Sequence, residues 1–400
     1  MKIIDVSNER EYLKEIKDRK KFIMDEVDKA VEYIIKDVML NKDDAVREYT
    51  KKFDNVLIKD FLVSQKEIED ALRNTSDALL KDLEKAKVII EKYHKKQMMK
   101  SYSIYEGEDM IFGQLVRPLE RVGIYIPGGR AAYPSTVLMN AVPAKIVGVK
   151  EIIMITPPDA DGRIRDSILA AAYIAGVDKI YKIGGVQGIA ALAFGTESIP
   201  KVDKITGDGN IYVTSAKRKV NGLVGIDMIA GPGEILIIAD EWANPKYIAA
   251  DLISQAECGE MLSAILVTYW EPLAYKVLNE LELQLKYLER GGIVEKSLRN
   301  NGFIIIVSCM AEAVDVANEI APERLEILTR DPFEVYRGIK NAGAIFLGEY
   351  SFHASGFLSP LSVDDFVKKT SLIYYSKQAL YERKYSIMGI AQEEGLTGHV

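Results

Sequence analysis

Cysteine, histidine and tryptophan are scarce in this chain of 400 residues, which holds two, three and two of them. The two cysteines, Cys258 and Cys309, cannot supply a disulfide framework, and this fits a reducing compartment. No apolar run approaches the roughly 20 residues that a membrane-spanning helix needs, and the first residues lack the apolar segment of a secretory signal. We therefore expect a cytoplasmic protein without a membrane partner.

An excess of positive charge is also missing, since the formal net charge is −7. A nucleic acid or an anionic membrane would select a basic face, so neither partner is expected. Hydrophobic residues make up 48% of the chain and are interspersed with charged ones, as in globular proteins. A chain of this length predicts about two to four domains.

The chain changes character near Gly123. Before it, apolar residues recur at helical spacing, followed by predicted strands over 102–118 with a turn near Gly107. After it, short apolar strands alternate with helices. The predicted strands are 123–126, 151–156, 179–183, 203–205, 234–239, 264–269, 303–307 and 344–347. The predicted helices of the first set are 135–147, 164–175, 187–194 and 212–220. This alternation predicts an α/β fold with doubly wound parallel sheets, and residues 374–395 are predicted to be helical.

A glycine-rich turn, Pro127-Gly128-Gly129, ends the first of these strands and leads toward a helix. Glycines at such a place let a ligand approach the backbone, and a helix N-terminus favours phosphate. Many α/β proteins carry glycine there for steric reasons alone, so both interpretations stay open. The strict G-x-G-x-x-G fingerprint of dinucleotide-binding folds is absent.

Several blocks of sequence occur in a characteristic order. They are VGIYIPGG at 122–129, STVLM at 135–139, GGVQGIAALAFGTE at 184–197, VDKI at 202–205, IDM at 226–228, AGP at 230–232 and SQAE at 254–257. In order and spacing these blocks resemble the histidinol dehydrogenase family, and the resemblance extends from near residue 20 to the last helix. Several blocks in register are far more specific than one glycine-rich motif.

This resemblance implies two incomplete Rossmann-like, doubly wound domains with helical N- and C-terminal segments. In the family the second domain interrupts the first. We therefore expect an N-terminal helical segment over 1–21, a first domain over 22–124 plus 233–360, a second domain over 125–232 and a C-terminal tail over 361–400. The tail is expected to pack on the partner subunit of an intertwined homodimer.

The resemblance also implies NAD as cofactor, contacted by Tyr125, Gln187 and Asn210. One neighbouring position differs, because Asp208 stands where the family usually has proline. A carboxylate repels an anionic dinucleotide unless it points into solvent or bonds a ribose hydroxyl. The loss of proline also loosens the turn.

Gln255 and Cys258 are three residues apart on a predicted helix and therefore share one face. From the residues alone, Cys258 is either a metal ligand or a small buried thiol. The resemblance implies zinc, held by Gln255, by Cys258 in place of a histidine, and by His399. The family's remaining ligand, an aspartate, falls on Phe357, and the loop after it is missing. His353 lies close by in the sequence as another candidate.

The catalytic positions of the family fall on Glu323 and Arg324. In the family the glutamate activates the water that adds to an aldehyde, and a histidine follows it as base. Arg324 cannot act as that base, because a guanidinium keeps its proton near neutral pH. It is either solvated or paired with Glu323 on a helix-to-strand turn, or it binds an acidic substrate. The substrate contacts implied are Gly233, Gln255, Cys258, Glu394 and His399.

Three functions follow from these positions. The leading hypothesis is NAD-dependent oxidation of L-histidinol to L-histidine in histidine biosynthesis, with a small amino alcohol as substrate. The second is a paralogue that oxidises another small alcohol with Arg324 in its site, acidic alcohols included. The third is a non-catalytic dimeric homologue that serves as a scaffold or ligand sensor. Zinc content and NAD affinity discriminate among them.

Overall fold

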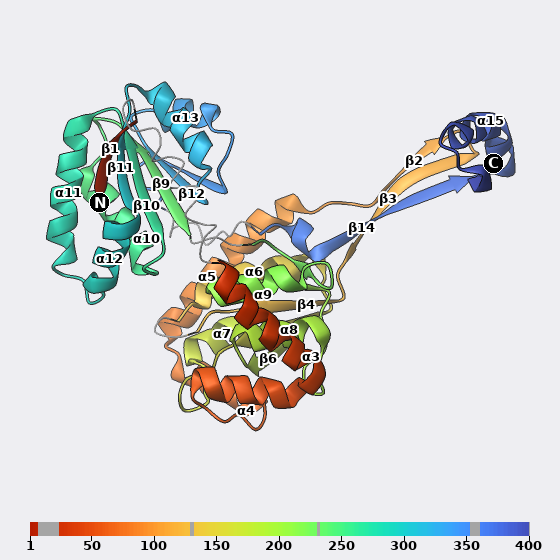
Figure 1. Ribbon diagram of the computed structural model, residues 1–400, viewed down its shortest axis with the longest axis horizontal. Coiled ribbons are helices and arrows are strands. Elements are labelled where there is room, and N and C mark those ends of the chain that lie inside the picture. Colours follow the sequence, from red (N-terminus) through yellow and green to blue (C-terminus); the bar gives the residue numbers. More distant parts are fainter. Residues whose placement is uncertain (7–23, 129–131, 230–232, 353–360, 400) are drawn as a thin grey trace.

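The protein consists of two α/β lobes and a long β arm (Figure 1). This computed structural model describes all residues except 7–23, 129–131, 230–232, 353–360 and 400. Among the described helices, none is long and apolar enough to cross a membrane. The α/β fold class and the parallel sheets predicted from the sequence are confirmed.

The first lobe contains a five-stranded parallel sheet in the order β6-β5-β4-β7-β8. Its strands are β4 (Arg121–Tyr125), β5 (Glu151–Thr156), β6 (Lys179–Lys182), β7 (Lys204–Thr206) and β8 (Gly225–Ile226). Both faces of the interior strand β5 are covered, because Ile153 and Ile155 belong to one hydrophobic cluster while Ile152 and Met154 belong to the other. A strand buried on both sides explains the unbroken apolar run in its sequence.

The helices of this lobe come from two separate parts of the chain. They are α3 (Met24–Asp54), α4 (Gln65–Asn74), α5 (Asp77–His94), α6 (Pro134–Val147), α7 (Asp166–Ala175), α8 (Gly185–Phe194) and α9 (Ile211–Val220). Val31 and Val38 of α3 pack in one cluster with Ile189 of α8. The sequence predicted that residues 22–124 form one domain with 233–360. The structure corrects this prediction, because the helices α3–α5 and the strand β4 belong to the first lobe. Helical periodicity reveals an apolar face but not which sheet that face covers.

The second lobe contains a six-stranded parallel sheet in the order β1-β11-β10-β9-β12-β13. Its strands are β1 (Lys2–Asp5), β9 (Glu234–Ala239), β10 (Ser263–Thr268), β11 (Gly302–Ile306), β12 (Arg324–Leu328) and β13 (Ala344–Leu347). Its helices are α10 (Pro245–Glu257), α11 (Glu271–Leu285), α12 (Gly291–Asn301), α13 (Met310–Ile320) and α14 (Pro332–Val335).

The start of the chain differs from the predicted helical segment over 1–21. Residues Lys2–Asp5 form the edge strand β1, with Ile4 opposite Ile305 of β11. Apart from Met1 and Val6, the rest of the segment lies outside the described residues. A strand this short depends on hydrogen bonds from a partner that is remote in sequence, so its own residues do not reveal it.

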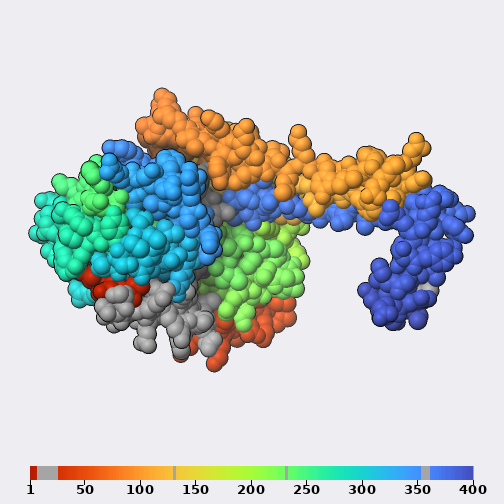
Figure 2. All heavy atoms as spheres, turned by 90° about the horizontal axis from the view of Figure 1, so that it is seen from above, coloured from red at the N-terminus to blue at the C-terminus, as the bar shows by residue number. Residues whose placement is uncertain are grey.

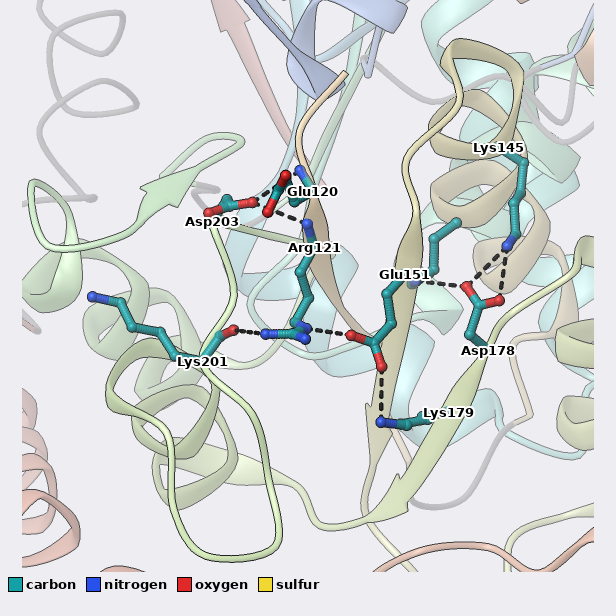
Figure 3. A network of polar contacts seen from close by, with 9 residues as sticks. Glu120, Arg121, Lys145, Glu151, Asp178, Lys179, Lys201 and Asp203 are labelled. Carbon is teal, nitrogen blue, oxygen red and sulfur yellow. Dashed lines mark hydrogen bonds and ion pairs between the residues drawn. The ribbon is translucent and has the colours of Figure 1, made fainter. Parts of the chain in front are cut away.

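A polar network closes the amino edge of the five-stranded sheet (Figure 3). Glu151 at the start of β5 pairs with Arg121 at the start of β4 and accepts from Lys179 at the start of β6, at 2.8 Å. These two cations hold the pKa of the Glu151 carboxyl below its ordinary value, with Lys179 first. Asp178 accepts from the Ile152 backbone N–H at 2.7 Å. The strands are thus held in register at the amino edge of the sheet.

The arm is a three-stranded antiparallel sheet in the order β14-β3-β2, formed by β2 (Tyr102–Glu106), β3 (Met110–Pro118) and β14 (Val367–Tyr375). It projects away from both lobes and carries α15 (Lys377–Glu393) at its tip (Figures 1 and 2). The predicted helix over 374–395 is confirmed for most of its length, although Tyr374 and Tyr375 belong to β14. An arm of this length buries little of its own apolar surface.

Candidate active site

The five-stranded sheet has a topological switch point between β4 and β7. From β4 the chain continues to β5 and β6 on one side, and β7 then starts on the other side of β4. Ligands of open α/β sheets bind at such a point, outside the carboxyl ends of the strands. Tyr125 ends β4, and the loop Gly207–Asn210 follows β7. Two of the three predicted NAD contacts therefore come from the two strands that border the switch point.

The backbone at this switch point is closely packed. Gly207 has φ +107°, and a Cβ added there would lie 2.1 Å from the Tyr125 carbonyl oxygen. No other residue fits, because L side chains rarely adopt this φ. The Tyr125 hydroxyl accepts a hydrogen bond from the Gly185 N–H at 3.4 Å, and burial raises the pKa of this phenol to about 12. The phenol therefore stays neutral in the physiological range.

A buried ion pair is hydrogen-bonded to the first residue of the loop Gly207–Asn210. Lys217 pairs with Asp227, and both side chains are only 2% exposed. The Lys217 ammonium donates to the Gly207 carbonyl at 2.8 Å, while Asp227 accepts from the Gly207 N–H at 2.8 Å. Both backbone groups of Gly207 are thus satisfied by one charge pair, which sets the conformation of the loop.

The other two predicted NAD contacts differ in accessibility. Asn210 is exposed and caps α9, because its side-chain oxygen accepts from the N–H groups of Tyr212 and Val213 at 3.1 Å each. Gln187 on α8 is fully buried, and among the described residues neither its amide oxygen nor its amide nitrogen has a hydrogen-bond partner. An unpaired buried amide is destabilising by about 1–3 kcal/mol, and a bound polar group would relieve this.

In the second lobe, Glu323 and Arg324 lie at the start of β12. Arg324 Nη2 is 3.2 Å from Glu323 Oε1, and Arg324 Nη1 donates to Gln255 Oε1 at 3.2 Å. The predicted helix-to-strand turn is confirmed, since α13 ends at Ile320 and β12 begins at Arg324. Arg324 was expected either to be solvated or paired with Glu323, or to bind an acidic substrate. This geometry supports the pairing with Glu323.

The predicted substrate contacts of the second lobe surround Gly233, which immediately precedes β9. A Cβ added to Gly233 would lie 3.1 Å from Gln255 Nε2 and 3.2 Å from Glu323 Oε2. Gln255 lies in the last turn of α10 and is buried, whereas Cys258 caps that helix and is exposed. Partial removal of the Cys258 thiol from water still raises its pKa, and the positive charge of Arg324 opposes this rise.

Charged groups of the two lobes act on one another at this point. The pKa of the Asp208 carboxyl is raised above its ordinary value, first by loss of hydration and then by Asp227 and Glu323, while Lys217 and Arg324 lower it. Asp208 nevertheless keeps exposed surface, so its carboxylate is not enclosed. From the same lobe, burial raises the pKa of Tyr133, and Cys258 adds to that rise. The charges of Glu323 and Arg324 therefore act on the loop that borders the switch point.

Two predicted site residues are not brought to this place. Glu394 and His399 lie beyond α15 at the tip of the arm, and both are exposed (Figure 1). The predicted metal set Gln255, Cys258 and His399 is therefore not assembled within one chain. Phe357 and His353 fall outside the described residues.

A separate cavity of about 540 Å³ opens at the carboxyl edge of the six-stranded sheet. Trp242, Cys309 and Arg330 are among its lining residues, and none of the predicted site residues is. Its size alone does not make it the reaction site, because no predicted contact for cofactor or substrate reaches it.

Comparison with known proteins decides the family. The family model described as histidinol dehydrogenase matches residues 17–400. A histidinol dehydrogenase of Clostridium acetobutylicum is 51% identical over 97% of this chain and 94% of that protein. One of Lactococcus lactis is 47% identical over 100% of this chain and 97% of that protein. The crystal structure of histidinol dehydrogenase from Elizabethkingia anophelis matches 100% of this chain and 95% of its own with a TM-score of 0.92 at 36% identity.

The chain belongs to the histidinol dehydrogenase family. It is thereby a member of a family of NAD-dependent oxidoreductases that serve histidine biosynthesis and act on a small-molecule substrate. Family membership implies NAD and zinc as cofactors in general. NAD fits the first lobe, where the buried unpaired amide of Gln187 and the glycine cradle at Gly207 adjoin the switch point.

Zinc does not fit the donors that one chain brings together. The Gln255 oxygen already accepts from Arg324, and Cys258 is left as the single predicted ligand beside it. Within the described part of the chain, no group of three or more His, Cys, Asp or Glu side chains could hold a metal ion. The described residues of the second lobe thus present a guanidinium and a carboxylate at this place.

Two contributors to the site were not predicted. Lys217 stands on the apolar face of α9 with Val213 and Val220, and a lone charge on such a face is a sequence signal for a buried ion pair. Tyr133 directly precedes α6 and gives no such signal. Its position near Cys258 depends on how the two lobes meet.

Proposed function

We propose that this protein oxidises L-histidinol to L-histidine where the switch point of the first lobe faces Glu323 and Arg324 of the second. The observation that supports the proposal is that the charges of Glu323 and Arg324 act on the pKa of the Asp208 carboxyl, in the loop after β7. It supports assigning the predicted NAD contacts and the predicted catalytic pair to one site. Fold similarity alone would not do so.

The first lobe is the NAD side of the proposed site. Tyr125 and Asn210 border the switch point, and Gln187 lies beneath the Gly184–Gly185 turn, where a cofactor amide would meet its unpaired group. Bound NAD⁺ supplies a hydride acceptor, one for each of the two oxidations. Asp208 is exposed, which leaves it free to face a ribose hydroxyl rather than a phosphate.

Glu323 is the general base in this proposal. In the first oxidation its carboxylate takes the hydroxyl proton, and an aldehyde forms. In the second it takes a proton from the water that adds to the aldehyde, and the hydrated aldehyde becomes the carboxylic acid. Arg324 cannot take a proton. At 3.2 Å it keeps a positive charge beside Glu323, where negative charge develops on the reacting oxygen.

The arm provides the remaining substrate contacts in the proposed dimer. Apolar side chains are exposed along its strands and on α15: Tyr102, Ile104, Tyr105, Ile373, Tyr374, Leu380, Tyr381, Tyr385 and Ile390. An exposed apolar surface of this kind marks a protein interface. A second copy of the chain that covers the arm would bring its own Glu394 and His399 to the site of the first, next to Gly233, Gln255 and Cys258.

The metal set Gln255, Cys258 and His399 stays a prediction that requires His399 of a second copy. No step above passes through it. The two other functions also stay predictions. In oxidation of an acidic alcohol the substrate carboxylate would have to compete with Glu323 and Gln255, which already engage two nitrogens of the Arg324 guanidinium.

The test is NADH formation by the purified dimer with L-histidinol at mildly alkaline pH, in the presence and absence of added zinc. We expect two NADH for each L-histidinol consumed. Glu323→Gln is the matched control and should remove the signal. If the folded dimer binds NAD but forms no NADH with L-histidinol, the substrate assignment is wrong. If it does not bind NAD, the result favours the hypothesis of a non-catalytic homologue.

A further inference from the structure

The side-chain amide of Gln255 is held in one orientation by Arg324. Its oxygen accepts from Arg324 Nη1 at 3.2 Å, and its nitrogen lies on the side of Gly233. A flipped amide would place two donors against each other, because a guanidinium offers only N–H groups. Gln255 is 2% exposed, so it cannot turn its oxygen elsewhere without repacking. The donor atom that a metal would need is therefore already in use.

The same guanidinium also holds the carboxylate of the site. Arg324 Nη2 lies 3.2 Å from Glu323 Oε1, and the other oxygen, Oε2, faces the space beside Gly233. One cation thus contacts an amide oxygen and a carboxylate oxygen, which are the kinds of donor that a hard metal ion takes. The side chain of Arg324 is 36% exposed, so part of the guanidinium remains open to a ligand.

A divalent metal bound to Gln255 would have to lie beside this guanidinium. Like charges at such a distance repel, and Arg324 has no neutral form to adopt. The two cations are therefore alternatives for the same oxygen. We propose that the guanidinium of Arg324 takes the place of a metal ion in this site, where it orients Gln255 and Glu323 and stabilises negative charge on the substrate oxygen.

The first part of this proposal concerns metal content and does not depend on turnover. The second part rests on the proposed function. It predicts that L-histidinol oxidation continues in the presence of a strong chelator, because the required positive charge is covalently part of the chain.

The experiment is the measurement of zinc bound by the full-length dimer, purified without a metal-affinity tag and dialysed against zinc chloride, by elemental analysis and by competition with a chromophoric chelator. We expect far less than one zinc per subunit. Arg324→Met removes the charge and keeps the bulk, and should tighten zinc binding at least tenfold. Arg330→Met is the matched control, because Arg330 is an exposed arginine that stacks on Trp242 at 4.8 Å, away from the site. It should change nothing.

Two results would overturn the proposal. One is stoichiometric zinc in the unaltered dimer. The other is equal zinc affinity in the unaltered protein and in Arg324→Met, because Arg324 would then not be what excludes the metal. Far-UV circular dichroism tests whether Arg324→Met folds. If that variant does not fold, Arg324→Gln is used in its place. The zinc measurements do not require turnover of L-histidinol. The proposed oxidation of L-histidinol and the proposed replacement of a metal by Arg324 can therefore fail independently.

Discussion

Lys217 and Asp227 form an ion pair in the interior of the first lobe, with both side chains 2% exposed, and Gly207 is hydrogen-bonded to both. Pairs of this kind contribute little net stability when intact, but the loss of one partner strands the other charge. Here the pair also sets the loop that borders the proposed NAD site. Its stability and its function are therefore coupled.

Lys217→Met should lower the free energy of unfolding by about 3–5 kcal/mol, because Asp227 is left buried without its cation. NAD affinity should fall by about tenfold as the Gly207 carbonyl loses its donor. Chemical denaturation and calorimetric titration measure the two effects. Lys219→Met is the control, since Lys219 lies on the same helix and pairs with Glu32 near the surface at 3.6 Å. Equal losses in both variants would contradict the anchoring role.

Glu323→Gln should lower kcat for L-histidinol by about a hundredfold to ten-thousandfold, as expected when a general base is removed. The amide keeps the size of the carboxylate, so folding should be unchanged. Glu282→Gln on an exposed position of α11 is the control and should keep full activity. Steady-state NADH formation reports both. A near-normal kcat of the Glu323→Gln variant would show that another group acts as the general base.

The free energy of unfolding should fall with rising pH because of the carboxyl pair Asp251 and Glu326 in the second lobe. Burial, and then Glu326, raise the pKa of Asp251 to about 8. The folded state thus retains a proton that the unfolded chain releases above about pH 4. This proton stabilises the fold below that value, and its contribution is lost as pH rises toward 8, with a slope of up to about 1.4 kcal/mol per unit.

Asp251→Asn tests this pH dependence, because an amide mimics the protonated carboxyl at every pH. We expect the variant to have a flatter profile of unfolding free energy between pH 5 and 8 than the unaltered protein. Asp315→Asn, at an exposed position of α13, should keep the original slope. Denaturant titrations at several pH values give the slopes. Parallel profiles for all three proteins would rule out Asp251 as the group responsible.

Complementation between inactive variants tests whether the arm completes the site of a second copy. Glu323→Gln and Glu394→Gln should each abolish or strongly reduce activity alone. Mixed dimers would contain one site with both changes and one intact site, so mixing after mild dissociation should restore roughly a quarter of normal activity. If Glu394 served its own chain, mixing would restore nothing.

The sequence alone was sufficient for the features that depend on local pattern. The strands β4, β5, β9 and β13 and the helix α6 follow from apolar runs and periodicity. The family, the fold class and the candidate residues Tyr125, Gln187, Asn210 and Glu323 follow from motifs with fixed spacing. Such signals survive because each is carried by neighbouring residues.

Only the tertiary structure decided which sheet the helices α3–α5 cover, that β1 pairs with β11, and that Arg324 engages both Glu323 and Gln255. It also placed α15, which Glu394 and His399 follow, at the tip of an arm away from α10, where Gln255 and Cys258 lie. Each of these depends on contacts between residues remote in the chain. Helical or strand periodicity specifies that a face is buried, whereas the partner of that face is selected by packing of the whole fold.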